Sequence, residues 1–299
     1  MNGIARYQQL CARFPQAFGP ECTEAARRWA ALSPAEQAGL GVVEEHPRWL
    51  WVREQGPDGP RERPVYLDPR LEKQIEGYFA LMEARPELFF PSELYPICAD
   101  RRMLLAFEEE TGRPAGLVFD NLPYYQTVAD LILGEPPYLY GRVVYPDPSV
   151  GGTVMVPLLE TAEGPRYGLL QVYRHSIRGL SGGEFPRGYQ CQGISPEENA
   201  KKELWEELAI PPEQVAELTF LGRTRPDTGL SGALVSIYLA RVTAAPTPSL
   251  GYEGITGLEW LSREELLRRL GAGEITDGLT QSAALLCLLH SQPDGPGSA

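Results

Sequence analysis

Hydrophobic and polar positions recur along this chain with periods that predict helices and strands in both halves. In the N-terminal half, Ile75, Tyr78, Phe79 and Met82 follow one another at helical spacing. Capping residues and breakers place the ends of such segments. The patterns predict helices beginning at Ser33, running from Asp68-Pro69 through Met82, covering Asp100–Glu110 with Thr111-Gly112 as the stop, and covering Tyr124–Leu133.

Short apolar runs predict strands between these helices. Trp49–Val52 and Pro64–Leu67 are expected to form a hairpin joined across a polar loop, Gln55–Arg63. A further strand fits Gly116–Phe119. In the C-terminal half, Val154–Leu159 and Leu234–Ala240 are apolar on both faces, which is typical of buried strands.

The clearest helix begins at Ser195. Ser195 is expected to be the N-cap, Pro196 the first helical residue and Glu198 the returning carboxylate of a capping box. Pro211-Pro212 ends the helix. Its buried stripe, four residues apart, is Ala200, Leu204 and Leu208.

Three glutamates, Glu203, Glu206 and Glu207, lie beside that stripe at spacing i, i+3, i+4. This spacing gathers three carboxylates on one side of the helix, where their mutual repulsion is unfavourable unless a cation lies among them. Mg²⁺ or Mn²⁺ suits carboxylate oxygens. A solvated acidic helix face is the simpler alternative. A glycine-bearing loop, 188–193, precedes the helix and lets backbone approach a ligand closely.

The whole segment from Gly188 to Ile210 resembles the signature of the Nudix hydrolases. That signature places a glycine, a first glutamate, Arg-Glu, an aliphatic residue, Glu-Glu, a glycine and a last aliphatic residue at fixed positions. The chain matches it without gaps at Gly188, Glu203, Leu204, Glu206, Glu207 and Ile210. We call this segment the Nudix box.

The Nudix box departs from the family pattern at three positions: Ile194 replaces the first Glu, Lys202 the Arg, and Ala209 the Gly. Lys202 keeps the positive charge but cannot hold a carboxylate with a bidentate fork, so Glu203 is expected to be held more loosely. Ala209 is expected to cost little, provided that the helix end does not need a left-handed conformation.

The resemblance extends over about half the chain. Tyr173-Arg174 and Glu184–Gly188 look like segments of the ADP-ribose and nucleotide-sugar diphosphatase branch, and Gly273–Asp277 with Thr280 looks like its last helix entry. The resemblance implies an α/β/α sandwich around a mixed sheet. We expect a mainly helical α+β region at 1–136, the Nudix domain at 137–290 and a disordered tail at 291–299. Gly134–Pro137 is either a linker or a tight turn.

The resemblance implies hydrolysis of a nucleoside diphosphate linked to another moiety, of the ADP-ribose or nucleotide-sugar type, with Mg²⁺ or Mn²⁺. Glu203 and Glu207 would be the principal metal ligands, together with the backbone carbonyl of Arg187. Glu206 would be a further ligand or would orient water.

Substrate binding is expected around the start of the Nudix box, at Arg174, Glu184, Arg187 and Gly188. The guanidinium forks of Arg174 and Arg187 fit phosphate oxygens, although structural salt bridges explain them nearly as well. The general base is open: Asp227 is the only carboxylate on the later loop 225–232, where an Asx turn is the alternative role, and Glu206 is the other candidate.

Composition limits the kinds of partner and the cellular compartment that we expect for this protein. The 27 basic and 40 acidic residues give a net charge of −13, which disfavours nucleic acids and anionic membranes. The 5 cysteines are scattered without a C-x-x-C pair, and no histidine lies near Cys191 to activate it as a nucleophile. We see no signal peptide and no spanning segment, so we expect a cytoplasmic protein.

Two other functions stay open. A non-catalytic Nudix-fold sensor for ADP-ribose or a similar ligand would explain the altered box positions, and RNA decapping shares the signature but is disfavoured by the charge. We expect a homodimer, and the N-terminal half could dimerise, cover the active site or select substrate. Its aromatic residues are expected to be core rather than a base-stacking platform: Trp29, Trp49, Trp51, Tyr78 and Phe79.

Overall fold

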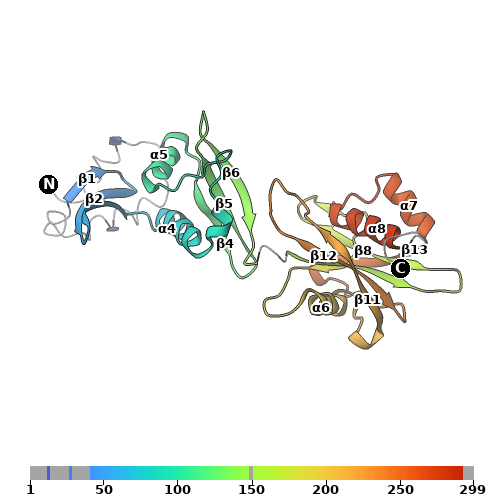
Figure 1. The fold of residues 1–299 in the computed structure, drawn as a ribbon. Helices are drawn as coiled ribbons and strands as arrows, with labels where there is room; N and C mark the ends of the chain where they lie inside the picture. Colours follow the sequence, from blue (N-terminus) through green and yellow to red (C-terminus); the bar gives the residue numbers. More distant parts are fainter. Residues whose placement is uncertain (1–11, 14–26, 29–40, 148–150, 292–299) are drawn as a thin grey trace. The chain divides into compact units, whose positions relative to one another are not determined.

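A computed structural model describes residues 12–13, 27–28, 41–147 and 151–291 of the chain. The chain divides into two compact units, residues 1–143 and 144–299, here called the N-terminal and C-terminal units (Figure 1). The helix expected from Ser33, Trp29 and the tail after Ser291 lie outside the described residues. No helix in the described ranges is long and apolar enough to cross a membrane.

The first sheet of the N-terminal unit is antiparallel and contains β1 (Gly41–Glu45), β2 (Trp49–Gly56) and β3 (Gly59–Tyr66). The hairpin is confirmed, but the expected long loop is wrong, because Gly56 pairs directly with Gly59. Arg61 and Glu62, which were assigned to that loop, are strand residues that pair across the hairpin with Glu54 and Arg53. A strand face that meets water carries charge, so polarity alone did not reveal the strand.

The N-terminal unit also contains two helices that the sequence predicts. α4 (Pro69–Ala84) begins at the N-cap Asp68, and α5 (Arg101–Thr111) begins at the N-cap Asp100 and ends at Gly112 in the left-handed conformation. A short 3-10 helix, η2 (Pro86–Phe89), follows α4.

The second sheet of the N-terminal unit is also antiparallel, in the order β4 (Gly116–Asn121), β5 (Tyr125–Ile132) and β6 (Tyr138–Val144). The strand expected at 116–119 is confirmed, whereas the helix expected over 124–133 is wrong. The run from Val128 to Ile132 is buried on both faces. A continuous buried run has no period of its own, so only pairing with β4 and β6 decides that it is a strand.

Of the aromatic residues expected in the core, four lie in the described part of the chain. Trp49, Trp51 and Tyr78 are buried, and Phe79 is partly buried.

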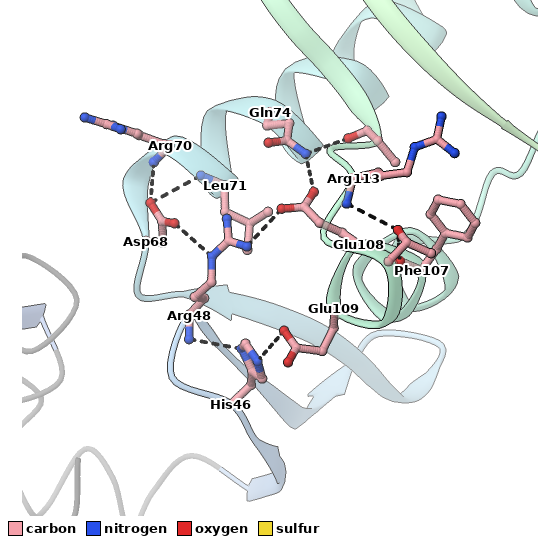
Figure 2. A network of polar contacts seen from close by, with 12 residues as sticks. His46, Arg48, Asp68, Arg70, Leu71, Gln74, Phe107, Glu108, Glu109 and Arg113 are labelled. Atoms are coloured by element: carbon pink, nitrogen blue, oxygen red, sulfur yellow. Dashed lines mark hydrogen bonds and ion pairs between the residues drawn. The ribbon is translucent and has the colours of Figure 1, made fainter. Parts of the chain in front are cut away.

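A polar network joins the start of β2 to both helices (Figure 2). In it, Arg48 donates to the carboxylates of Asp68 and Glu108, which come from the start of α4 and from α5. With its antiparallel sheets and separate helices, the N-terminal unit is α+β.

The C-terminal unit is built on a mixed sheet with the strand order β11-β12-β7-β8-β13. β7 and β12 pair in parallel, whereas β11 with β12, β7 with β8 and β8 with β13 pair antiparallel. The two strands predicted from apolar runs, which are β7 and β12, are confirmed. The bounds are β7 (Gly152–Leu159), β8 (Arg166–Arg174), β11 (Val215–Thr224), β12 (Val235–Val242) and β13 (Ile255–Leu261).

Helices cover both faces of this sheet (Figure 1). Leu204 and Leu208 of α6 (Pro196–Leu208) pack in one core with Met155 and Leu170. A second core on the other face holds side chains of α7 (Arg263–Gly271) and α8 (Gly278–His290) with alternate residues of β7 such as Val154. The α/β/α sandwich is confirmed. The short elements are β9 (Gly179–Leu180), β10 (Arg187–Gly188), η3 (Pro212–Gln214) and η4 (Tyr252–Gly254).

Candidate active site

The helix of the Nudix box forms as its sequence predicts. Ser195 caps α6 with its hydroxyl oxygen, which accepts from the N–H of Glu198 at 3.2 Å, while the Glu198 carboxylate accepts from the N–H of Ser195 at 2.7 Å. The expected apolar stripe is fully buried against the sheet. Burial of this stripe fixes which side of α6 the glutamates occupy.

The end of α6 contradicts one expectation. Ala209 caps the helix in the left-handed conformation, with φ 51° and ψ 32°. The Cβ of a non-glycine residue is crowded in this region of φ/ψ space, which explains why the family signature has a glycine there. Ala209 therefore does carry a conformational cost that the sequence analysis did not assign to it.

Glu203 and Glu207 meet the two residues of β10. Oε2 of Glu207 accepts from the N–H of Arg187 at 2.9 Å. A Cβ added to Gly188 would lie 2.1 Å from Cδ of Glu203, so the carboxyl group of Glu203 occupies the space above a bare glycine backbone. The first glycine of the Nudix box is thus required by the close approach of this glutamate.

Glu206 is more exposed and is held by Lys202. The Lys202 ammonium lies 2.6 Å from Oε2 of Glu206 and 3.3 Å from Oε1 of Glu203. Burial alone would lower the pKa of Lys202, but the neighbouring carboxylates outweigh it and raise that pKa. The hydroxyl of Tyr252 also donates to Glu206, at 3.3 Å. Lys202 therefore supplies positive charge to the carboxylate group from within the helix.

Burial dominates the electrostatics of the other two glutamates. It raises the pKa of Glu207 to about 8, against the hydrogen bond from Arg187. It also raises the pKa of Glu203, despite the Lys202 ammonium. Desolvation penalises a buried carboxylate anion that has no cation beside it. A bound divalent cation would remove this penalty and favour the charged form of both carboxylates.

Glu253 is a site residue that the sequence analysis missed. Its negative charge contributes to the raised pKa of both Glu203 and Glu207. Its backbone is left-handed at φ 45°, and it lies in η4 between Gly251 and Gly254. Strained non-glycine residues of this kind gather at functional sites. The only sequence signal was a glutamate within the short segment Gly251–Gly254, far from the Nudix box.

The segment that carries Glu253 is attached to α6. Ser249 donates its N–H to the backbone carbonyl of Glu207 at 2.9 Å. This bond uses a carbonyl at the C-terminal end of the helix, where no intrahelical donor is available. The loop 249–254 is thereby fixed beside the glutamates, with Tyr252 on Glu206.

Arg174, Glu184 and Arg187 form one ion cluster. Glu184 is almost fully buried, and its carboxylate accepts from Arg174 at 3.1 and 2.7 Å and pairs with Arg187 at 2.7 Å. Arg187 also pairs with Asp277 at 2.7 Å. The side-chain hydrogen bond to Glu184 raises the pKa of Arg174. Both guanidinium groups are thus already engaged by carboxylates of the protein.

Asp227 is placed in a turn on the loop that follows β11. Its Oδ1 accepts from the N–H of Gly229 at 2.8 Å, and its carbonyl accepts from Leu230 and Ser231. This is the geometry of an Asx turn. The sequence had left this role open beside that of general base.

The donors around Gly188 fit a hard divalent cation in their chemistry. They are carboxylates gathered on one helix face, with a bare glycine backbone beside them. Among the described residues, no three acidic, cysteine or histidine side chains are grouped closely enough to hold an ion as they stand. Lys202 holds Glu206 and the Arg187 N–H holds Glu207, so rotations of these side chains would be needed.

Comparisons with known proteins give one match to a protein family. A family model of the NUDIX domain matches residues 151–279. No curated protein matches the chain.

Solved structures resemble the chain distantly. A structure titled an ADP compounds hydrolase is 16% identical with a TM-score of 0.45, covering 61% of this chain and 93% of that one. The NUDIX domain of Shewanella oneidensis NrtR complexed with ADP ribose is 17% identical with a TM-score of 0.33, covering 40% and 77%. A C. elegans Ap4A hydrolase binary complex is 19% identical with a TM-score of 0.33, covering 46% and 98%.

The assignment of this domain rests on the matched family model, not on these distant likenesses. Residues 151–279 of the chain are a NUDIX domain.

Proposed function

We propose that the C-terminal unit hydrolyses the diphosphate bond of a nucleoside diphosphate linked to another moiety, in a reaction that depends on Mg²⁺ or Mn²⁺. The observation that carries the proposal is the burial of Glu203 and Glu207 against the backbone of Arg187 and Gly188. Buried carboxylates without a strong partner are costly, and a cation site explains why they are kept there.

Glu203 and Glu207 would hold the cation, with Glu206 and the carbonyl of Arg187 as further donors. When bound, a divalent cation supplies neutralisation of the phosphate oxygens and lowers the pKa of a coordinated water. The remaining work falls to the protein, which must place the diphosphate, orient the water and accept its proton.

The proton of the attacking water needs a carboxylate acceptor near the metal ligands. Glu253 is the first candidate, because the loop that carries it is hydrogen-bonded to α6 through Ser249 and Tyr252. Glu206 is the second candidate, although Lys202 and Tyr252 already hold its carboxylate. Asp227 is the weakest of the three, since its side chain closes its own turn.

Arg174 and Arg187 would act on the substrate from within their cluster with Glu184. A guanidinium shared between a buried carboxylate and a phosphate keeps its orientation while offering its outer N–H groups. The substrate class that we propose, ADP-ribose or a nucleotide sugar, follows from the resemblance of the segments around Arg174 and Glu184. We further propose that the protein is a cytoplasmic homodimer.

The test is metal-dependent phosphate release from a panel of ADP-ribose, UDP-glucose, dinucleoside polyphosphates, NADH and flavin adenine dinucleotide. Wild type is compared with Glu207→Gln and with Glu197→Gln, a matched control on the exposed side of the same helix. Cleavage of one compound that needs metal, is lost in Glu207→Gln and is kept in Glu197→Gln would support the proposal. No cleavage of any compound under these conditions would overturn it.

One observation favours a non-catalytic sensor as the second candidate. Lys202, which replaces the arginine of the family pattern, lies between Glu203 and Glu206 and supplies a cation of its own. A site neutralised in this way could bind a nucleotide ligand without turnover. Tight binding of a panel compound that is not cleaved would support the sensor.

A further inference from the structure

The N-cap residue of α8 forms an ion pair with Arg187, the residue that precedes the first glycine of the Nudix box. Asp277 is the N-cap of α8, and its Oδ2 accepts from the N–H of Thr280 at 2.8 Å. Its other oxygen, Oδ1, accepts from Nη1 of Arg187 at 2.7 Å. One carboxylate thus performs two tasks, capping a helix and holding an arginine ninety positions away in the sequence.

Thr280 makes a second connection to the same segment. Its side chain is fully buried, and its hydroxyl donates to Oδ2 of Asp277 at 2.7 Å while accepting from the N–H of Phe185 at 3.1 Å. Both hydrogen-bonding functions of the hydroxyl are therefore used. A serine could replace it, whereas a valine of the same shape would leave the Phe185 N–H without this partner.

The other side of the segment faces α6. The N–H of Arg187 donates to Glu207, and the α-carbon of Gly188 lies against the carboxyl group of Glu203. α6 and α8 pack into separate cores on the two faces of the sheet. Residues 185–188 therefore connect the start of α8 directly to the glutamates of α6.

We propose that Asp277 and Thr280 are positioning residues of the active site. They fix residues 185–188 at the place where the backbone of Arg187 meets Glu207 and that of Gly188 meets Glu203. Without the hydrogen bonds from Asp277 and Thr280, residues 185–188 would move relative to α6. Glu203 and Glu207 would then lose the backbone against which they are oriented. The inference rests on the proposed function only where it concerns metal and turnover.

The alternative is that Asp277 and Thr280 merely stabilise α8. Ser262 provides a matched control, because it caps α7 through its side chain, which accepts from the N–H of Glu265 at 3.2 Å. Ser262→Ala removes a helix cap in the same unit without touching residues 185–188. A purely stabilising role predicts that Thr280→Val and Ser262→Ala behave alike.

The experiment uses the full chain and Mn²⁺ alone as the probe, with Thr280→Val, Thr280→Ser, Asp277→Asn and Ser262→Ala. We expect Thr280→Val and Asp277→Asn to weaken Mn²⁺ binding by about tenfold or more, as loss of an outer-shell partner does. Thr280→Ser should bind as wild type does. Ser262→Ala should lower the melting temperature but leave Mn²⁺ affinity unchanged.

Amide hydrogen exchange at Arg187 gives a readout that needs neither metal nor turnover. Its N–H is protected by Glu207 and should exchange faster in Thr280→Val than in Ser262→Ala. Equal protection in these two variants, or unchanged Mn²⁺ affinity in Thr280→Val, would overturn the positioning role. Failure of the proposed function would look different: wild type would bind no Mn²⁺ or cleave no compound, while the exchange result would still decide the role of Thr280.

Discussion

The main-chain N–H of Arg187 donates to the carboxylate of Glu207 at 2.9 Å, although the two residues are 20 positions apart. This bond joins the short strand β10 to the helix that carries the Nudix box. The side chain of Arg187 forms ion pairs with Glu184 and Asp277. Backbone and side chain of a single residue thereby connect the glutamates of α6 with the start of α8.

Glu207→Gln should strongly reduce turnover while leaving the protein at least as stable as wild type. The amide oxygen of glutamine still accepts from the Arg187 N–H, whereas the charge needed to hold a divalent cation is lost. Removing a buried ionisable group also removes its desolvation cost. We expect a fall in kcat of about a hundredfold or more, with a metal-free melting temperature that is equal or higher. A large drop in melting temperature would contradict this explanation.

Lys202→Arg should increase turnover by a few-fold. A guanidinium holds a carboxylate through two parallel hydrogen bonds, whereas the Lys202 ammonium acts as a point charge between Glu203 and Glu206. Lys201→Arg is the control, because Lys201 pairs with Glu197 on the exposed side of α6. Steady-state kinetics at saturating metal measures the effect. Equal or lower activity in Lys202→Arg would show that the orientation of Glu203 does not limit the rate.

Ala209→Gly should stabilise the protein by up to about 1 kcal/mol. Ala209 is left-handed, so glycine relieves the crowding of its Cβ, although glycine also gains freedom in the unfolded chain. The matched control is Ala272→Gly at the end of α7, where the backbone is right-handed at φ −82°. That substitution should destabilise. Denaturant unfolding of both variants gives the comparison, and a loss of stability in Ala209→Gly would refute the assignment.

Glu253→Gly should separate stability from activity. Glycine adopts the left-handed conformation of residue 253 readily, so the melting temperature should rise, while turnover should fall because the carboxylate is lost. Glu253→Gln keeps the strain and removes only the charge. It should lose as much turnover without the gain in stability. Full activity in Glu253→Gln would eliminate this residue as the general base.

The N-terminal unit should lose stability on acidification because of His46. Nδ1 of His46 accepts from the N–H of Arg48 at 3.1 Å, and Nε2 faces Glu109 at 2.9 Å, so the ring is held neutral (Figure 2). Burial, followed by the nearby Arg48 charge, lowers the pKa of His46 from 6.5 to about 3. Between these values the unfolded chain binds the proton more readily than the folded one.

The contribution of His46 is therefore fully present above pH 6.5 and decreases as the pH falls toward 3, by at most about 1.4 kcal/mol for each pH unit. Denaturant unfolding of the N-terminal unit across this range measures the slope. His46→Gln, which does not titrate, should show a shallower slope. His175→Gln in the C-terminal unit is the control and should leave the slope as it is in wild type. Equal slopes in wild type and His46→Gln would contradict the prediction.

The sequence by itself determined the elements whose signals are local. The N-cap Ser195, the helix starts at Asp68 and Asp100 and the stop at Gly112 were readable because capping involves residues within one helical turn. The buried stripe of α6 and the spacing of its glutamates followed from the helical period in the same way. The NUDIX domain was also readable, because the signature of the Nudix box is continuous in the sequence.

Only the tertiary structure decided what depends on contacts between distant residues. The strand over 125–132 needed its neighbours, because a segment buried on both faces has no period to distinguish it from a helix. The placement of the loop 249–254 beside α6 and of Asp277 on Arg187 came from the packing of loops and helix ends onto the sheet. The left-handed backbone at Ala209 likewise emerged only with the chain path after α6. Long-range packing, which no local pattern encodes, sets each of these features.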